Sequence, residues 1–194
     1  MKEEVTQAMD LRLMIVGWSG IGKSTFVLRF IQDMFYEEYD PTLEDVFCKL
    51  VPINAEQRNL QIFDSNCYQE QRSGWMSPQY MRNSDGFICA FSITDPSSLP
   101  ELQKLIESIK REKDIDDICL IVVGNKCDLE CERKVSTEEG KNFADKNNAP
   151  FFETSAKFNI NINEAVFFLA QEVCRREVEF ANEETNQKKK CVVC

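Results

Sequence analysis

The 194-residue sequence contains no histidine, so no catalytic triad or metal site within this chain can use an imidazole. No apolar run approaches about 18 residues, and we therefore expect no transmembrane helix. The first residues, Met1-Lys2-Glu3-Glu4, lack the apolar segment of a secretory signal. Acidic residues outnumber basic ones by 33 to 23, and the net charge of −10 argues against general binding of nucleic acids. These absences favour a cytosolic protein in which most of the nine cysteines are reduced thiols.

The stretch from Gly17 to Ser24 reads GWSGIGKS, which is the G-x-x-x-x-G-K-S pattern of a phosphate-binding loop. A strand-like run at 11–16 precedes it, and a helix from about Lys23 to Gln32 is expected to follow. Backbone N–H groups of such a loop wrap a polyphosphate, and the positive end of the helix adds to the attraction. Lys23 supplies a cation for the β- and γ-phosphates, and the Ser24 hydroxyl is suited to ligate Mg²⁺. The candidate phosphate-binding residues here are Ser19, Gly20, Ile21, Gly22, Lys23, Ser24 and Thr25.

The rest of the chain alternates between strand and helix patterns. Expected strands lie at 46–51, 59–63, 86–93, 118–123 and 151–154, and expected helices at 98–112, 136–146 and 162–180. A hairpin turn at 54–56 should join the first two strands, capping boxes at Ser98–Glu101 and Ser136–Glu139 should open two helices, and 65–85 reads as polar and irregular. This alternation predicts an α/β fold with a mostly parallel sheet between helices. We expect one domain at 11–180, a flexible N-terminus at 1–10 and a flexible tail at 181–194.

A second set of polar residues indicates which base is bound. Asn125, Lys126 and Asp128 follow a buried strand, and Ser155, Ala156 and Lys157 follow the next one. A carboxylate at Asp128 accepts two hydrogen bonds from the guanine N1–H and N2 amine, a pair that adenine does not offer. The stem of Lys126 can cover the purine, Asn125 can tie loops together, and backbone N–H groups of 155–157 can reach the guanine O6. Ligands of α/β sheets bind at the carboxyl ends of the strands, where all these residues fall.

In order and spacing, these motifs resemble those of Ras-family small GTPases across nearly the whole chain. The segment Tyr39-Asp40-Pro41-Thr42-Leu43-Glu44-Asp45 resembles the Ras/Rap branch in particular. The resemblance implies a P-loop NTPase fold, with a six-stranded sheet flanked by about five helices. It implies that the chain binds GTP and GDP with Mg²⁺, hydrolyses GTP, and meets effector proteins, exchange factors and activating proteins.

The resemblance also assigns roles to single residues. Phe35 would pack on the guanine. Thr42 would ligate Mg²⁺ and sense the γ-phosphate, and Asp64 would hold Mg²⁺ through water, a role that suits an acid at a strand end beside phosphates. The effector-binding surface would run from about Tyr39 to Phe47.

Three residues depart from the family pattern around the γ-phosphate. Cys67 stands where the family has a phosphate-contacting glycine, and Tyr68 where it has the glutamine that orients the attacking water, a role for which Ras is the standard example. Ser19 adds a side chain inside the phosphate loop. With Lys23 as the remaining catalytic cation, we expect slow hydrolysis by a working switch. A binding module that stays loaded with GTP, and a chain that has lost nucleotide binding altogether, are the alternatives.

The last residues are Lys188-Lys189-Lys190-Cys191-Val192-Val193-Cys194. A cysteine followed by two aliphatic residues and one final residue is a prenylation signal, with Cys191 as the acceptor. Lys188–Lys190 would supply the second, electrostatic signal that stable anchoring needs. The sequence therefore predicts attachment to the cytoplasmic face of a membrane, with the plasma membrane as the expected site. A disulfide or metal half-site formed by Cys191 and Cys194 is the alternative.

Overall fold

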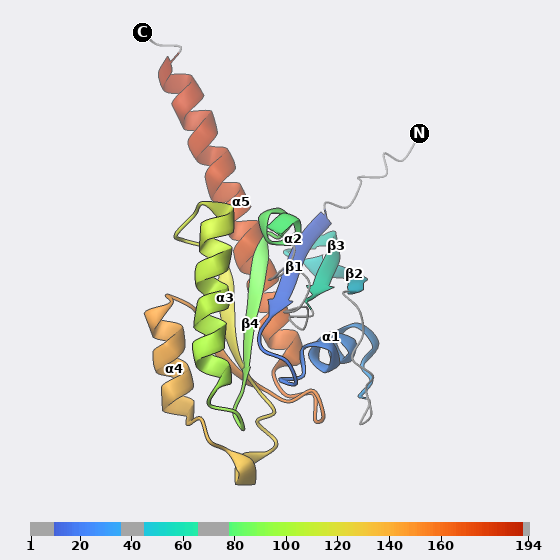
Figure 1. Ribbon diagram of the computed structural model, residues 1–194. Coiled ribbons are helices and arrows are strands. Elements are labelled where there is room, and N and C mark those ends of the chain that lie inside the picture. Colours follow the sequence, from blue (N-terminus) through green and yellow to red (C-terminus); the bar gives the residue numbers. More distant parts are fainter. Residues whose placement is uncertain (1–9, 36–44, 66–77, 192–194) are drawn as a thin grey trace, which may run out of the picture.

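The computed structural model describes residues 10–35, 45–65 and 78–191, with side chains described for all but Asp45 and residues 182–191. Its centre is a six-stranded sheet in the order β2-β3-β1-β4-β5-β6 (Figure 1). All strand pairs in this sheet are parallel except β2 with β3. The strands are β1 (Asp10–Val16), β2 (Asp45–Ile53), β3 (Glu56–Asp64), β4 (Gly86–Ser92), β5 (Leu120–Asn125) and β6 (Phe151–Thr154). The predicted α/β fold with a mostly parallel sheet is confirmed.

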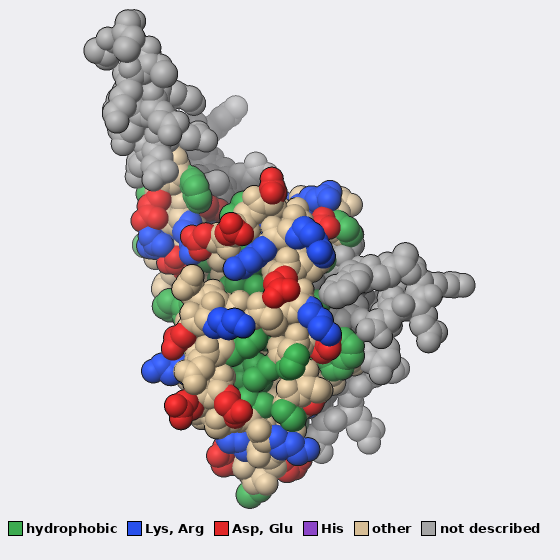
Figure 2. Space-filling view, turned by 60° about the vertical axis from the view of Figure 1, so that its left-hand side comes forward, with side chains coloured by type: hydrophobic (Ala, Val, Ile, Leu, Met, Phe, Trp, Pro, Cys, Tyr) green, Lys and Arg blue, Asp and Glu red, His purple; other side chains and the backbone are tan. Residues whose placement is uncertain are grey.

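Helices cover both faces of the sheet (Figure 1). They are α1 (Lys23–Gln32), α2 (Pro78–Asn83), α3 (Ser98–Lys113), α4 (Thr137–Lys146) and α5 (Ile162–Cys191), with the short 3-10 helix η1 (Glu130–Glu132) before α4. Helices α1 and α5 share one hydrophobic core with the sheet, and α2, α3 and α4 share the other. Acidic and basic side chains are interspersed over the face shown in Figure 2.

Strand β1 lies between β3 and β4 and contributes to both cores. Its side chains alternate, as those of a strand must. Leu13 and Ile15 belong to the core under α1 and α5, whereas Met14 and Val16 belong to the core under α3 and α4. Because β1 is buried on both faces, its C-terminal end, where the phosphate loop begins, is held firmly in place.

The hairpin turn between β2 and β3 is where the sequence places it. Asn54 and Ala55 have φ angles of 51° and 66°, and Ile53 pairs with Glu56 across the turn. Positive φ at both central residues matches the twist of an antiparallel pair. The turn thus fixes the register that brings Asp45 opposite Asp64 at the far end of the hairpin.

Of the two expected capping boxes, one is present. The Ser136 hydroxyl accepts a hydrogen bond from the Glu139 N–H at 3.2 Å, and the Glu139 carboxylate accepts one from the Ser136 N–H at 2.8 Å. The box predicted at Ser98 is wrong. Ser98 is already the first helical residue, and its buried hydroxyl donates to the Asp95 carbonyl and accepts from the Ser92 N–H instead. Burial of the hydroxyl makes it a partner for the strand end rather than a cap.

The helix predicted to end near Phe180 continues to Cys191, so that predicted end is wrong. Residues 181–191 contain neither glycine nor proline and include two glutamates and three lysines, which are good helix formers. The boundary drawn at 181 between domain and flexible tail therefore falls inside α5. In the segment read as irregular, residues 78–83 form α2, which buries Met81. None of the helices in the described parts of the chain is long and apolar enough to cross a membrane.

Candidate functional site

The phosphate loop, residues 17–24, connects β1 to α1 and lies against the ends of two other strands. Gly17 has a φ of 154°, and a Cβ there would lie 2.2 Å from the Ala90 carbonyl oxygen of β4. Gly22 has a φ of 93°, and a Cβ there would lie 2.7 Å from Nδ2 of Asn125. Both positions combine close approach with a backbone conformation that L side chains rarely adopt, so both require glycine.

Lys23, the first residue of α1, extends its side chain back to the start of the phosphate loop. Its side chain is buried, and Nζ donates to the Gly17 and Trp18 carbonyls at 2.9 and 3.0 Å. Gly22 at the N-cap has no side chain that could accept from the first N–H groups of α1. These N–H groups stand at the end of the loop and the ammonium contacts its first two residues, so donors occur at both ends of the loop, which suits an anion with several oxygens. Ser24 and Thr25 lie in the same first turn and are partly exposed, as is Ser19 in the loop.

Asn125, the last residue of β5, joins the phosphate loop to the expected base-binding residues. Its side chain is buried, and Nδ2 donates to the Ile21 carbonyl at 2.8 Å and more weakly to the Gly22 carbonyl at 3.4 Å. The Thr154 hydroxyl, at the end of β6, donates to Oδ1 at 3.3 Å. One amide therefore holds together the carboxyl ends of β5 and β6 and the loop that follows β1, as the sequence predicts for Asn125.

Lys126 and Asp128 lie beside this tie. Lys126 has a φ of 65°, and its Nζ reaches over to donate to the Gly20 carbonyl at 2.6 Å. Partial burial lowers the pKa of Lys126 from its ordinary value, and the nearby Asp128 carboxylate opposes that shift. The Cys127 N–H donates to the Thr154 carbonyl at 3.0 Å, which fixes the backbone between the two side chains. Asp128 remains partly exposed at the rim, where it can accept hydrogen bonds from a ligand.

Ser155, Ala156 and Lys157 begin a tight loop after β6. The Ser155 and Ile160 backbones exchange two hydrogen bonds of 3.2 and 2.9 Å, and the Ser155 hydroxyl accepts from the Phe158 N–H at 3.2 Å. Ser155 and Ala156 are buried, whereas Lys157 is exposed. The structure thus brings this loop to the same edge of the sheet as the residues 125–128, through the adjacent strands β5 and β6.

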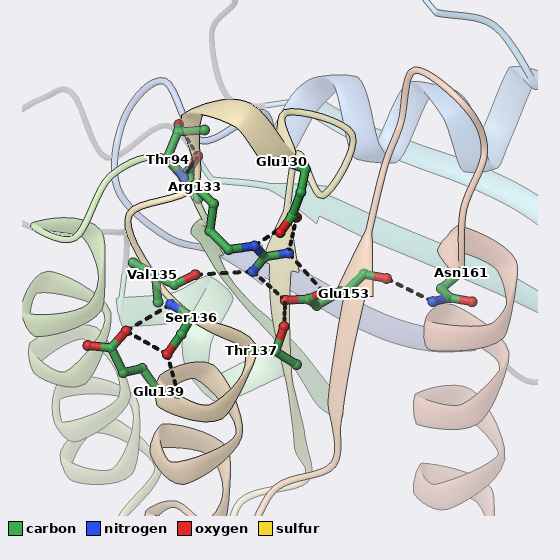
Figure 3. Close-up of polar contacts among 10 residues, drawn as sticks. Thr94, Glu130, Arg133, Val135, Ser136, Thr137, Glu139, Glu153 and Asn161 are labelled. Carbon is green, nitrogen blue, oxygen red and sulfur yellow. Dashed lines mark hydrogen bonds and ion pairs between the residues drawn. The ribbon is translucent and has the colours of Figure 1, made fainter.

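An ion-pair cluster centred on Arg133 holds the segment that follows Asp128 (Figure 3). The Arg133 guanidinium donates to both carboxylate oxygens of Glu153 at 2.7 and 3.2 Å, and to Glu130 at 2.8 Å. The hydrogen bonds from Arg133 to Glu153 are the largest cause of the raised pKa of Arg133. The Thr137 hydroxyl donates to the same Glu153 carboxylate at 3.0 Å. The cluster fastens η1 to β6, two residues before the Ser-Ala-Lys loop.

The two expected magnesium ligands that the structure describes, Ser24 and Asp64, suit the ion. Asp64 is the last residue of β3 and pairs with Ile15 of β1, so it stands at the edge of the sheet, beside the residue two positions before the phosphate loop begins. It is buried, with 7% exposed, and Ser65 after it is anchored by a 2.6 Å hydrogen bond from its hydroxyl to the Ile15 carbonyl. A carboxylate and the Ser24 hydroxyl are the oxygen donors that Mg²⁺ takes alongside phosphate oxygens and water. Thr42, the third expected ligand, lies outside the described residues.

Several other predicted positions also lie outside the described residues. They are Tyr39, Asp40, Pro41, Leu43 and Glu44 of the expected effector surface, together with Cys67 and Tyr68. Asp45 is the first residue of β2, and Cys191 is the last residue of α5. Phe35 is partly buried and packs against the core under α1 and α5.

Two residues at this edge, Arg29 and Arg133, were not predicted from the sequence. Arg133 contacts Glu153 across 20 residues, and Arg29 contacts Ala156 across 127. The one signal in the sequence is that Arg29 interrupts the apolar run from Phe26 to Ile31.

This arrangement can bind a purine nucleotide with its phosphates in the loop at 17–24 and its base between residues 125–128 and 155–157. A comparison with protein-family models agrees, because the model described as the Ras family matches residues 12–175. The matched range contains the phosphate loop at 17–24 and the base-binding residues at 125–128 and 155–157. Since it also covers most of the 194 residues, the chain belongs to the Ras family, whose members are small GTPases that bind GTP and GDP and act as switches.

Proposed function

We propose that this chain is a membrane-anchored GTP/GDP switch of the Ras/Rap-like branch that hydrolyses GTP slowly. One observation supports the nucleotide-binding part of the proposal. Nδ2 of Asn125 donates to the Ile21 carbonyl and Nζ of Lys126 to the Gly20 carbonyl, so the phosphate loop and the base-binding residues form one rigid unit. Such a unit suits a ligand that has a purine at one end and phosphates at the other. Mg²⁺ bound at Ser24 and Asp64 would neutralise charge on those phosphates.

The preference for guanine rests on Asp128. Its carboxylate would accept from N1–H and the N2 amine of guanine, and with adenine it would face an acceptor without a compensating partner. Competition against a fluorescent GDP analogue tests this. We expect GDP to displace the analogue at a concentration at least about 10²-fold lower than ADP, and Asp128→Ala to remove most of that difference. Equal displacement by ADP would contradict the guanine assignment.

Slow hydrolysis follows from the residues that would face the γ-phosphate. Ser19 brings a side chain into the loop, and the sequence places Cys67 and Tyr68 where the family has glycine and the water-orienting glutamine. A tyrosine has no amide to position water as donor and acceptor at once. Losing the assisted route could reduce the rate by about 10³–10⁵. Single-turnover hydrolysis of bound GTP should therefore be slow in the wild-type chain and faster in Tyr68→Gln.

A GTP-loaded module that recruits effectors without meaningful hydrolysis is the second candidate, and the same three residues favour it. Mass spectrometry of the nucleotide that copurifies with the protein separates the two. Mostly GDP indicates a switch that completes its cycle, whereas mostly GTP indicates a loaded module. If the wild type hydrolyses GTP at the rate of an ordinary family member, both the slow switch and the GTP-loaded module are wrong.

As partners we propose effector proteins that bind the segment from Tyr39 to Asp45, exchange factors and activating proteins. Ser19 would crowd the approach of an arginine supplied by an activating protein. Effector binding that depends on the nucleotide, with GTP stronger than GDP, would support the switch.

Membrane attachment is proposed through a prenyl group on Cys191, aided by Lys188–Lys190. The direction of α5 supports this, because the helix leaves the sheet at the end opposite the phosphate loop (Figure 1). An anchor there would leave the nucleotide site open to the cytoplasm. Replacing Cys191 with serine should release the protein from the plasma membrane into the soluble fraction. Unchanged membrane association of that variant would contradict the lipid anchor.

A further inference from the structure

The Arg29 guanidinium contacts three backbone carbonyls, one at the end of its own helix α1 and two in the distant loop after β6. Nε donates to the Ala156 carbonyl at 2.6 Å, and Nη2 donates to the Lys157 carbonyl at 3.1 Å. Nη1 donates to the Asp33 carbonyl at 2.8 Å. The side chain is only 13% exposed, and the contact to the Ala156 carbonyl is the most shielded of the three, whereas those to Lys157 and Asp33 are open to water. The Asp33 carboxylate, at 3.4 Å and 79% exposed, is the weakest of the contacts, and Arg29 is therefore chiefly a binder of carbonyls.

The contacts to Ala156 and Lys157 orient the loop that would recognise the base. In a trans peptide the C=O and the N–H of one unit point in opposite directions, and the structure has no cis bond in its described parts. With the Ala156 carbonyl drawn toward Arg29, the N–H of Lys157 points away from α1. This is the direction required for a backbone donor that faces a ligand rather than the helix.

The contact to Asp33 fixes the second segment. Asp33 ends α1 with a φ of 56°, and its N–H donates back to the Arg29 carbonyl at 3.0 Å. Arg29 and Asp33 are therefore joined twice: the Arg29 carbonyl accepts from the Asp33 N–H, and the Arg29 guanidinium donates to the Asp33 carbonyl. Asn159 adds a second brace from the other loop, with a 3.2 Å hydrogen bond to the Asp33 carboxylate. Two residues beyond Asp33 lies Phe35, the residue expected to pack on the base.

We propose that Arg29 is a positioning residue for guanine recognition. It fixes the position of the 155–157 loop relative to Asp33, two residues before Phe35. The proposal rests on the proposed binding of guanine nucleotide. It is specific to arginine, because a planar guanidinium presents several donors in a rigid fork. A lysine would offer one mobile ammonium and could satisfy only part of the set.

The test compares the release of GDP with that of the diphosphate of 2-aminopurine riboside, which keeps the N2 amine but lacks both O6 and the N1–H. We expect Arg29→Ala to release GDP about 10- to 100-fold faster, since hydrogen bonds from a charged donor are lost. Release of the 2-aminopurine nucleotide should change far less, so the ratio between the two nucleotides shrinks. Arg29→Lys, which keeps the aliphatic packing, should resemble Arg29→Ala in this ratio and guards against loss of the fold. Arg175→Ala removes an exposed arginine of α5 and should behave like the wild type.

If both nucleotides leave faster by the same factor, Arg29 only stabilises the fold and the positioning role is overturned. If neither rate changes in Arg29→Ala, its contacts do not matter for binding, and the proposal fails. If the wild type binds no guanine nucleotide, or holds the 2-aminopurine nucleotide as tightly as GDP, then the proposed function itself fails, and the assignment of Arg29 fails with it.

Discussion

Replacing Asn125 with alanine should weaken the fold and the nucleotide site together. The side chain is 2% exposed, and its amide makes buried hydrogen bonds to the Ile21 carbonyl at 2.8 Å and to the Thr154 hydroxyl at 3.3 Å. Alanine would leave both partners unsatisfied, at about 1–3 kcal/mol for each buried group. The third contact, to the Gly22 carbonyl at 3.4 Å, is long and partly exposed and adds little. We therefore expect the free energy of unfolding to fall by about 2–6 kcal/mol.

The affinity for GDP should fall as well, because one of the lost hydrogen bonds ends on the phosphate loop. If the free energy of GDP binding becomes about 1.4 kcal/mol less favourable, the affinity drops about tenfold. Urea unfolding with and without saturating GDP separates the two effects, since ligand linkage appears only in the difference.

Asn147→Ala is the matched control. Asn147 is 9% exposed, and its amide donates to the Phe143 carbonyl at 2.9 Å and to Gln103 at 3.1 Å, at the end of α4. Its loss should lower stability without changing the affinity for GDP. If Asn125→Ala lowers stability as Asn147→Ala does but binds GDP as tightly as the wild type, the reasoning that joins the two loops through this amide is refuted.

Three further predictions use the same geometry. Gly22→Ala should reduce GDP affinity more than Gly20→Ala in equilibrium titrations, because both have positive φ, but only at Gly22 does the Cβ meet Asn125, at 2.7 Å; equal losses would count against the clash. Gly140→Ala would place a Cβ 2.7 Å from the Phe151 ring. Overpacking costs about 1–3 kcal/mol and outweighs the helix preference for alanine, so urea unfolding should show a loss of about 1 kcal/mol. A more stable variant would show that the ring moves aside. Hydrogen bonds from Arg175 lower the pKa of Glu172 to about 2, below its ordinary 4.5, so this carboxylate stabilises the fold above pH 4.5 and the contribution is lost as pH falls toward 2. For this surface pair we expect at most about 1 kcal/mol, and Glu172→Gln should flatten the dependence of unfolding free energy on pH within that window.

Local sequence signals predicted the elements that depend on neighbouring residues. Helix α1 begins at Lys23 and ends at Gln32 as expected, because glycine punctuates its start and an apolar periodicity follows. The turn at Asn54 and Ala55 and the capping box at Ser136 are equally local, since each needs only residues three or fewer positions apart.

Features that depend on burial or on distant segments were not predictable in the same way. At Ser98 the sequence offered a cap, but tertiary burial gave the hydroxyl other partners. Helix α2 is short and packs through Met81 and Tyr80, and six residues are too few for a hydrophobic periodicity to reveal this. The site shows the same division: the sequence identified Gly22, Lys23 and Asn125 by motif, whereas Arg29 acts on residues more than 120 positions away.

Helix α5 carries the C-terminal end of the chain away from the nucleotide site. The helix has 30 residues, which corresponds to a length of about 45 Å, and it emerges from the same end of the sheet at which β1 starts with Asp10 (Figure 1). A surface or a bulky label attached beyond either element is therefore kept on the side away from the phosphate loop. Single molecules tethered by a C-terminal handle would present their nucleotide site outward in one orientation, so that exchange could be timed on a chip without blocking the entrance.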